Sequence, residues 1–267
     1  MLKHHSSQPT LPKQHGATLY VVIVLVMLSM LLALWASRTS IFGEMIVGND
    51  ADYQRAFEAA QALLQDAELD IRRENSNGSI CISDGSNPYL CRKGIAPYGM
   101  PSEEQDVTLL LANLESISSG PQCRHAVCAK RVGKQDFWNN TDESKGITLA
   151  QMENADVPSD ASKPPIGARY GQYTGATIGA TSNSILAYRG DDPLRGGWYW
   201  IEIMRYDSQT ASSSNLIATE TGMSSTQYLP LQLDINIVYR ITAVAHGIKP
   251  NTQVVLQQTY ARNRLKD

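Results

Sequence analysis

The sequence predicts an α+β fold in which a long N-terminal helix packs on a C-terminal antiparallel β-sheet. Three observations carry this prediction. Residues 17–36 form an uncharged apolar run, an amphipathic helical pattern follows to about residue 74, and the last third of the chain alternates apolar with polar residues. A helix with an apolar stripe and a sheet with an apolar face must each be covered, and packing one on the other covers both.

The apolar run, ATLYVVIVLVMLSMLLALWA, is long enough to cross a membrane. Twenty helical residues span about 30 Å, which matches the hydrocarbon core of a bilayer. A secretory signal peptide has a shorter apolar core and small residues before its cleavage site, whereas a cut after this run would place Leu34 at the −3 position. Lys3 and Lys13 precede the run without any acid, so we expect the N-terminus to stay in the cytoplasm.

An amphipathic helix is expected to continue the apolar run. Its stripe has spacings of three and four residues, as one face of a helix requires. The stripe consists of Phe57, Ala60, Leu64, Ala67 and Ile71. The glycines at positions 43 and 48 separate the two halves and are expected to loosen or bend the helix. Asn49 or Asp50 is a candidate N-cap for the second half.

The remainder divides into a loop-rich part, residues 75–165, and a mainly β part, residues 166–267. Glycine, proline, serine and asparagine cluster in the first part, where only residues 107–114 form a short apolar element of undecided type. Three segments of the second part have the alternation of strands: residues 198–206, 231–245 and 252–260. This alternation is typical of an antiparallel sheet with one covered face.

Four cysteines follow the apolar run: Cys81, Cys91, Cys123 and Cys128. An even number of cysteines in an exported segment predicts disulfides, with three connectivities for four residues. We favour Cys81–Cys91 with Cys123–Cys128, because both pairs close short loops. The alternative is free or metal-binding cysteines, but the spacings match no zinc pattern well and His125 is the only imidazole nearby.

Charge and motifs argue against nucleic-acid binding and against an enzyme. The net charge is −3 and the pI is near 6.0, so no basic surface for phosphate is expected. The chain has no nucleophile-elbow, zinc-protease or phosphate-loop motif. Residues 84–87 gather oxygen ligands but lack the twelve-residue calcium loop. The paired acids lie in turn-like segments and are interpreted as solvated loop charges: Glu103–Glu104, Asp142–Glu143 and Asp191–Asp192. We therefore expect no catalytic residue, no metal and no cofactor.

Three blocks of the sequence resemble the PilX family of type IV pilus minor pilins. They are HGATLYVVIVLVMLSMLLALWASRTS, EMIVGNDADYQRAFEAAQALLQDAE and YRITAVAHGIKPNTQVVLQQTY. The resemblance implies cleavage by a prepilin peptidase between Gly16 and Ala17, and N-methylation of Ala17. It also implies a leader of residues 1–16, a transmembrane helix of residues 17–36, its continuation over residues 37–74, and a periplasmic head of residues 75–267.

The fifth residue after the implied cut is Val21, where major pilins have a glutamate. In those proteins the carboxylate pairs with the amine of the preceding subunit. Because an ionisable group at bilayer depth is costly unless it is paired, an apolar residue suits a subunit with no neighbour ahead of it. Val21 is therefore compatible with a place at or near the fibre tip, and equally with an ordinary membrane helix.

The resemblance implies a minor pilin that helps to initiate type IV pilus assembly and so supports adhesion and twitching motility. Its partners would be the other minor pilins, the major pilin and the prepilin peptidase, with a large tip adhesin as a further candidate. It would lie in the bacterial inner membrane and then in the fibre. Two alternatives stay open. One is a tip pseudopilin of a type II secretion system, and the other is a single-pass anchored periplasmic binding module or hydrolase.

Overall fold

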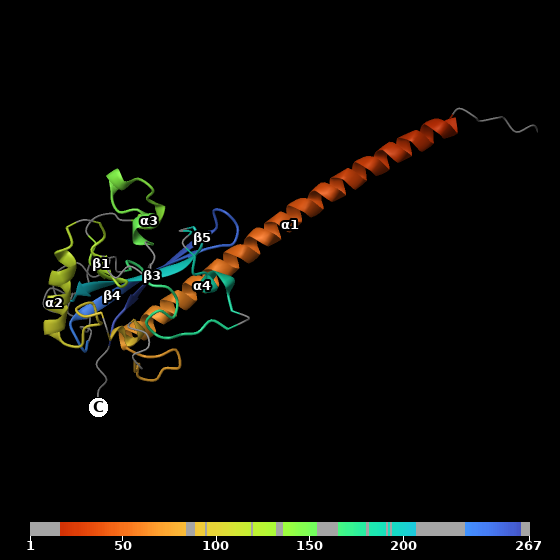
Figure 1. Ribbon diagram of the computed structural model, residues 1–267. Helices are drawn as coiled ribbons and strands as arrows, with labels where there is room; N and C mark the ends of the chain where they lie inside the picture. The colour runs from red at the N-terminus through yellow and green to blue at the C-terminus, as the bar shows by residue number, and fades with distance from the viewer. Residues whose placement is uncertain are drawn as a thin grey trace, which may run out of the picture. The chain divides into compact units, whose positions relative to one another are not determined.

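The computed structural model describes residues 17–83, 89–93, 95–118, 120–131, 136–153, 165–179, 182–190, 192, 194–206 and 233–262. These residues fall into two units, Met1–Asp50 and Ala51–Asp267. We call the second unit the head. The helix α1 (Ala17–Arg72) contributes to both units (Figure 1).

The first unit consists, in its described part, of the N-terminal portion of α1. All of residues 17–47 are exposed, including the apolar run. This helix is long and apolar enough to cross a membrane, judged by length and composition. Gly43 and Gly48 do not interrupt it, and Asn49 and Asp50 lie inside it. The prediction of an N-cap at Asn49 or Asp50 is therefore wrong, because the helix is continuous through both positions. The prediction that the amphipathic pattern continues the apolar run as one long helix is confirmed.

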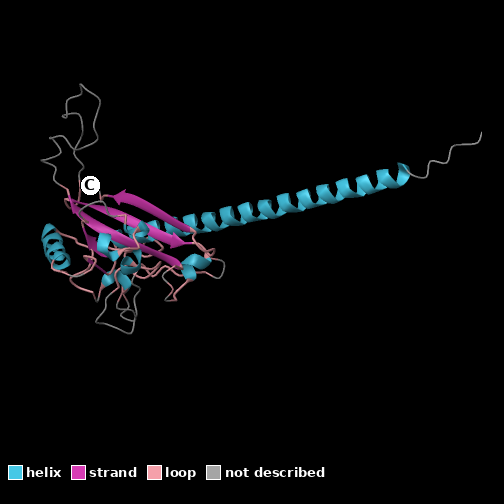
Figure 2. Cartoon of the chain, turned by 90° about the horizontal axis from the view of Figure 1, so that it is seen from above, coloured by secondary structure: helices cyan, strands magenta, loops and turns pink. Residues whose placement is uncertain are grey.

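The head is built on a five-stranded sheet with the order β1–β2–β3–β4–β5. Its long strands are β3 (Gly196–Arg205), β4 (Ile237–His246) and β5 (Gln253–Tyr260), which are antiparallel neighbours as predicted (Figure 2). Two short strands from the loop-rich part extend it, β1 (Cys123–Arg124) and β2 (Val127–Ala129). Because β2 runs parallel to β3, the sheet is mixed, and residues 130–195 supply the long crossover that a parallel pair requires.

One face of the sheet is covered by the part of α1 that belongs to the head. Ala60, Leu64, Ala67 and Ile71 of the predicted stripe are buried there, and Phe57 is partly buried. The facing sheet residues are Tyr199, Ile201, Ile203, Tyr239, Ile241, Ala243 and Ala245. A Cβ on Gly197 would lie only 2.7 Å from Cδ1 of Leu63. Glycine at this position therefore allows α1 to approach the backbone of β3 closely.

The opposite face is covered as well, which differs from the predicted single covered face. Trp198 and Trp200 pack there against Phe137 of η2 (Phe137–Asn139) and Met152 of α3 (Leu149–Met152). The Trp200 indole nitrogen donates to the Met152 carbonyl at 3.0 Å. Strand β3 is consequently buried on both faces from Gly196 to Ile203. Its sequence alternates apolar with polar residues only because Glu202, a charged residue, is buried in it as well.

Short helical segments complete the described head. The undecided apolar element is a helix, α2 (Glu104–Glu115), which buries Val107, Leu110 and Leu114. The others are η1 (Leu90–Arg92), η3 (Glu143–Lys145) and α4 (Ser184–Ala187). The strand predicted over residues 231–245 begins only at Ile237; Leu233 and Ile235 are buried before it, and residues 234–236 form a bend. Residues 231 and 232 lie outside the described residues.

Candidate functional site

Three aspartates on the sheet-facing side of α1 are buried in the head. Asp52, Asp66 and Asp70 are 0%, 1% and 5% exposed. A carboxylate removed from water is costly unless hydrogen bonds or an opposite charge compensate it. The partners of these aspartates therefore define how α1 is held on the head.

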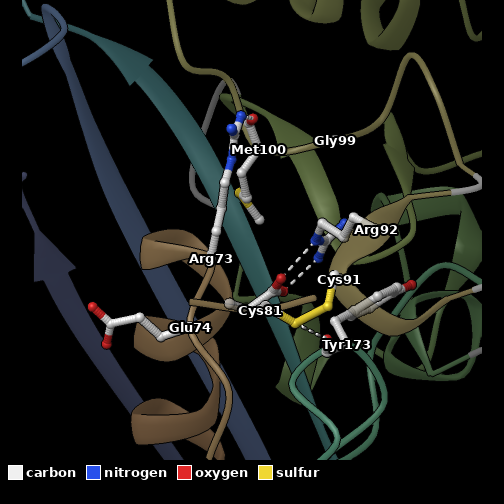
Figure 3. A pocket seen from close by; sticks show the side chains of 9 residues that line it. Arg73, Glu74, Cys81, Cys91, Arg92, Gly99, Met100 and Tyr173 are labelled. Atoms are coloured by element: carbon white, nitrogen blue, oxygen red, sulfur yellow. Dashed lines mark hydrogen bonds and ion pairs between the residues drawn. A yellow bond between two sulfur atoms is a disulfide. The ribbon is translucent and has the colours of Figure 1, made fainter. Parts of the chain in front are cut away.

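Asp70 forms a buried ion pair with Arg92 of η1. The guanidinium donates from Nε to Oδ1 at 2.7 Å and from Nη2 to Oδ2 at 2.6 Å, which is the two-point geometry of a strong arginine–carboxylate pair. The Tyr199 hydroxyl of β3 donates a further bond to Asp70 Oδ2 at 3.0 Å. Figure 3 shows the Arg92 bonds as dashed lines. This carboxylate thus joins α1 to η1 and to the centre of the sheet.

The remaining donors of Arg92 connect it to two further segments. Nη1 donates to the carbonyls of Tyr98 at 3.2 Å and His125 at 2.9 Å, and the guanidinium lies 3.9 Å from the centre of the Tyr173 ring. His125 lies in the turn between β1 and β2. One arginine therefore contacts four parts of the head that are far apart in sequence.

The other two aspartates accept hydrogen bonds from loop segments of the head. Asp66 accepts from the Gly171 amide at 2.7 Å and from the Thr174 hydroxyl. Asp52 accepts from the amides of Ile248 and Lys249 at 2.9 and 3.0 Å, next to the turn between β4 and β5. The three aspartates thus attach the buried part of α1 to the head near both of its ends, Asp52 at the first and Asp66 with Asp70 at the second.

Both disulfides of the favoured connectivity are present, Cys81–Cys91 and Cys123–Cys128. The first places its second cysteine directly before Arg92, and the second joins β1 to β2 at opposed positions. His125 lies between the second pair, and its Nδ1 is 3.3 Å from the Tyr173 hydroxyl. These contacts assign His125 to the packed interior of the head.

A cavity of about 150 Å³ lies beside the first disulfide (Figure 3). Its lining includes Asp70, Arg73, Glu74, Arg92 and Tyr173, together with the disulfide and residues 99–100. The charged groups already have partners: Arg73 donates to the Met100 carbonyl, and Glu74 pairs with Arg72 at 3.0 Å. In Figure 3, Glu74 points away from the other labelled side chains. Within the described residues, this arrangement presents no nucleophile with an adjacent base.

A second buried charge cluster lies on the other face of the sheet. Glu202 accepts from Arg131 at 2.9 and 2.6 Å and from Arg240 at 2.6 and 2.8 Å. Burial alone would raise the pKa of Glu202, but these two arginines outweigh it and lower the pKa to about 2. Glu153 and His246 form another buried pair, with 2.6 Å between Oε1 and Nε2. Sequence analysis found none of these pairs, because their members lie 38 to 93 residues apart.

The paired acids that the structure describes take part in structural hydrogen bonds. The Asp106 carboxylate accepts from the Glu103 amide at 3.2 Å in the capping box of α2, and Glu104 accepts from the Asn236 amide at 3.1 Å. Asp142 caps η3 through the Ser144 amide at 3.0 Å. Asp191 and the segment 84–88 lie outside the described residues.

Among the residues that are described, no group of three histidines, cysteines or acids is arranged to hold a metal ion.

The residues assigned to processing belong to the first unit. Gly16 lies outside the described residues, and Ala17 is the first residue of α1. Val21 follows one turn later and is 53% exposed, among apolar side chains on all sides of the helix. The exposed apolar helix suggests membrane anchoring.

The helix, the sheet on which its second half packs and the two disulfides define a pilin-like α+β protein. A family model described as "Type IV pilus assembly protein PilX C-term" matches residues 119–262, more than half of the chain. The chain therefore belongs to the PilX family of type IV pilus assembly proteins. No curated protein and no solved structure matches the chain. The family has a structural role in pilus assembly, which involves other pilins, and the matched segment contains all five strands.

Arg92→Met is expected to lower the free energy of unfolding by about 3–5 kcal/mol, because it leaves the Asp70 carboxylate buried without its counter-ion. Urea unfolding of the full chain in detergent, followed by tryptophan fluorescence, measures this. Asp70→Asn combined with Arg92→Met should recover much of the loss. Arg72→Ala, which breaks an exposed pair, should cost less than about 1 kcal/mol. Equal effects of Arg92→Met and Arg72→Ala would contradict the assigned role.

Asp66→Asn is expected to stabilise the head at neutral pH. Burial raises the pKa of Asp66 to about 6, against the bonds from Thr174 and Gly171, which lower it. Between pH 3.8 and about 6, the Asp66 carboxyl is therefore protonated in the native state and ionised in the unfolded state. As a result, the contribution of Asp66 to the free energy of unfolding of the wild type falls as the pH rises from about 4 to above 6. Urea unfolding of both proteins between pH 4 and 7.5 measures the difference.

The pH-dependent part of this difference should approach roughly 3 kcal/mol at pH 7 and shrink to about 0.5 kcal/mol at pH 4. Glu202 and His125, whose pKa values are lowered to about 2 and about 4, are present in both proteins and cancel in the comparison. A difference that does not change with pH would show that Asp66 is ionised in the same range in both states.

Proposed function

We propose that this chain is a minor pilin that helps to prime type IV pilus assembly at or near the tip of the fibre. Membership of the PilX family supplies the role in pilus assembly. The exposed apolar helix with Val21 in place of a glutamate is the observation that supports the more specific role. Adhesion and twitching motility then follow as consequences of having a fibre.

Processing is part of this proposal. The prepilin peptidase cuts between Gly16 and Ala17, and Ala17 becomes the methylated N-terminus of the mature chain. Ala17 opens the apolar run and is the first described residue of α1, so a chain cut here begins with its apolar helix. Before assembly the helix lies in the inner membrane with the head in the periplasm. In the fibre it packs against the helices of neighbouring pilins in place of lipid.

The partners follow from this placement. The helix contacts the other minor pilins and the major pilin, and the head is presented to the same subunits and to a large tip adhesin. The two disulfides support a periplasmic head, because disulfides persist in oxidising compartments. The family match to the head favours the pilus over a type II secretion system.

Val21→Glu is expected to reduce the number of pili per cell several-fold. In a subunit with no neighbour ahead of it, the new carboxylate has no amine to pair with and must be accommodated unpaired among apolar helices. The measurement is electron-microscopic counting of pili on a deletion strain that is complemented with each variant at equal protein level.

Val21→Ile is the matched control, because it keeps the position apolar and should restore the wild-type count. Wild-type or higher pilus numbers with Val21→Glu would place the subunit inside the fibre, behind a neighbour that supplies an amine. A deletion strain with normal pili would reject the priming role altogether.

A further inference from the structure

Strand β5 forms one edge of the sheet in the described head. It pairs with β4 on one side over its whole length, from Gln253 to Tyr260. In the part of the chain that the structure describes, no strand lies on its other side. The other edge of the sheet is β1, which has only two residues.

The free backbone groups of β5 can be assigned. The Gly247 amide donates to the Thr252 carbonyl at 2.8 Å, so these residues form a hydrogen-bonded pair next to the ladder. Bonded and non-bonded pairs alternate along antiparallel strands. Residues 254, 256, 258 and 260 therefore bond to β4, and residues 253, 255, 257 and 259 direct their amides and carbonyls to the open edge.

This edge lacks the features by which proteins usually prevent strand addition. The strand, QVVLQQTY, contains no charge and no proline, and its register with β4 is unbroken by a bulge. Exposed edges are commonly protected by lysine, proline or bulges. Gln257 and Thr259 are exposed, so the open backbone is accessible at that end of the strand.

Both hydrophobic cores extend to this edge. Leu256 and Tyr260 are partly buried and pack against the cluster beneath α1, whereas Val255 is partly buried and packs against the tryptophan cluster on the other face. A further strand beside β5 would cover the exposed parts of these side chains on both faces. The segment that fits is uncharged and has apolar residues on both of its faces, like the neighbouring strands.

We propose that β5 is a docking edge for an extended, uncharged segment of another pilin subunit, which adds a sixth strand to the sheet. Backbone hydrogen bonds supply the affinity, and the side chains that meet Val255, Leu256 and Tyr260 supply the fit. The docked segment belongs to another subunit anchored in the same membrane, because the contact is too small to be stable between proteins that are free in solution. One eight-residue strand covers less surface than a stable complex in solution requires.

Anchoring in a common membrane compensates for this small contact, because it keeps the two heads at a high effective concentration. This step rests on the proposed function, which places the chain among other anchored pilins. The contact would form while the subunits are still in the membrane, and would orient the head of this subunit against its neighbour.

Amide hydrogen exchange of the full chain tests the edge directly. The chain is purified in detergent alone, and again in complex after co-expression with the major pilin and each other minor pilin in turn. We expect exchange at residues 255, 257 and 259 to slow on the order of tenfold or more in one of these complexes. Unchanged exchange along β5 in every complex would overturn the proposal, and so would protection that arises only from a second copy of this chain.

Two variants distinguish strand addition from mere proximity. Gln257→Pro removes one outward backbone donor and no backbone bond to β4, and the double variant Gln257→Lys/Thr259→Lys adds charges at exposed positions without altering the backbone. Both variants also lose the bond from the Gln257 side-chain amide to the Thr242 hydroxyl of β4, which is 3.0 Å long. Both should abolish the protection, whereas Leu109→Lys on the exposed side of α2 should retain it. Protection that survives both edge variants would overturn the proposal. The N-terminus of each sample, read by mass spectrometry, separately reports whether the chain is processed as a pilin.

Discussion

The ion pair between Asp70 and Arg92 is the interaction on which the organisation of the head depends. Its carboxylate belongs to α1, its guanidinium to η1, and the Tyr199 hydroxyl attaches both to the middle of β3. Because both charges are buried, neither can exchange its partner for water. The position of the helix and the positions of the loops are therefore specified by the same contact.

The surroundings of this pair explain the placement of the disulfides. Cys81–Cys91 closes the chain directly before Arg92, and Cys123–Cys128 closes the turn whose His125 carbonyl accepts from Arg92. The two disulfides thus restrain the two loop segments that meet at Arg92, residues 81–91 and residues 123–128. Asp66 and Asp52 repeat the principle with backbone amides as partners. The part of α1 that belongs to the head is thereby attached by directional bonds as well as by apolar packing.

The elements that depend on local pattern could be predicted from the sequence. The apolar run, the stripe from Ala60 to Ile71 and the three long strands repeat with the period of their secondary structure, and short loops made both disulfides foreseeable. The rest depends on contacts between distant residues. Asp70 resembles a solvated helix residue until Arg92 is placed beside it, and Glu202 resembles the exposed side of a strand until Arg131 and Arg240 cover it. The parallel pairing of β2 with β3 likewise could not be predicted, because its long crossover has no periodic sequence pattern.

Assembly as a pilin, as proposed above, requires cleavage that leaves Ala17 as the mature N-terminus. Mass spectrometry of the N-terminus, on protein expressed with and without the prepilin peptidase, tests it most directly. We expect a chain that begins with methylated Ala17 only when the peptidase is present. An intact leader in both strains would contradict it and leave a membrane-anchored protein outside the fibre.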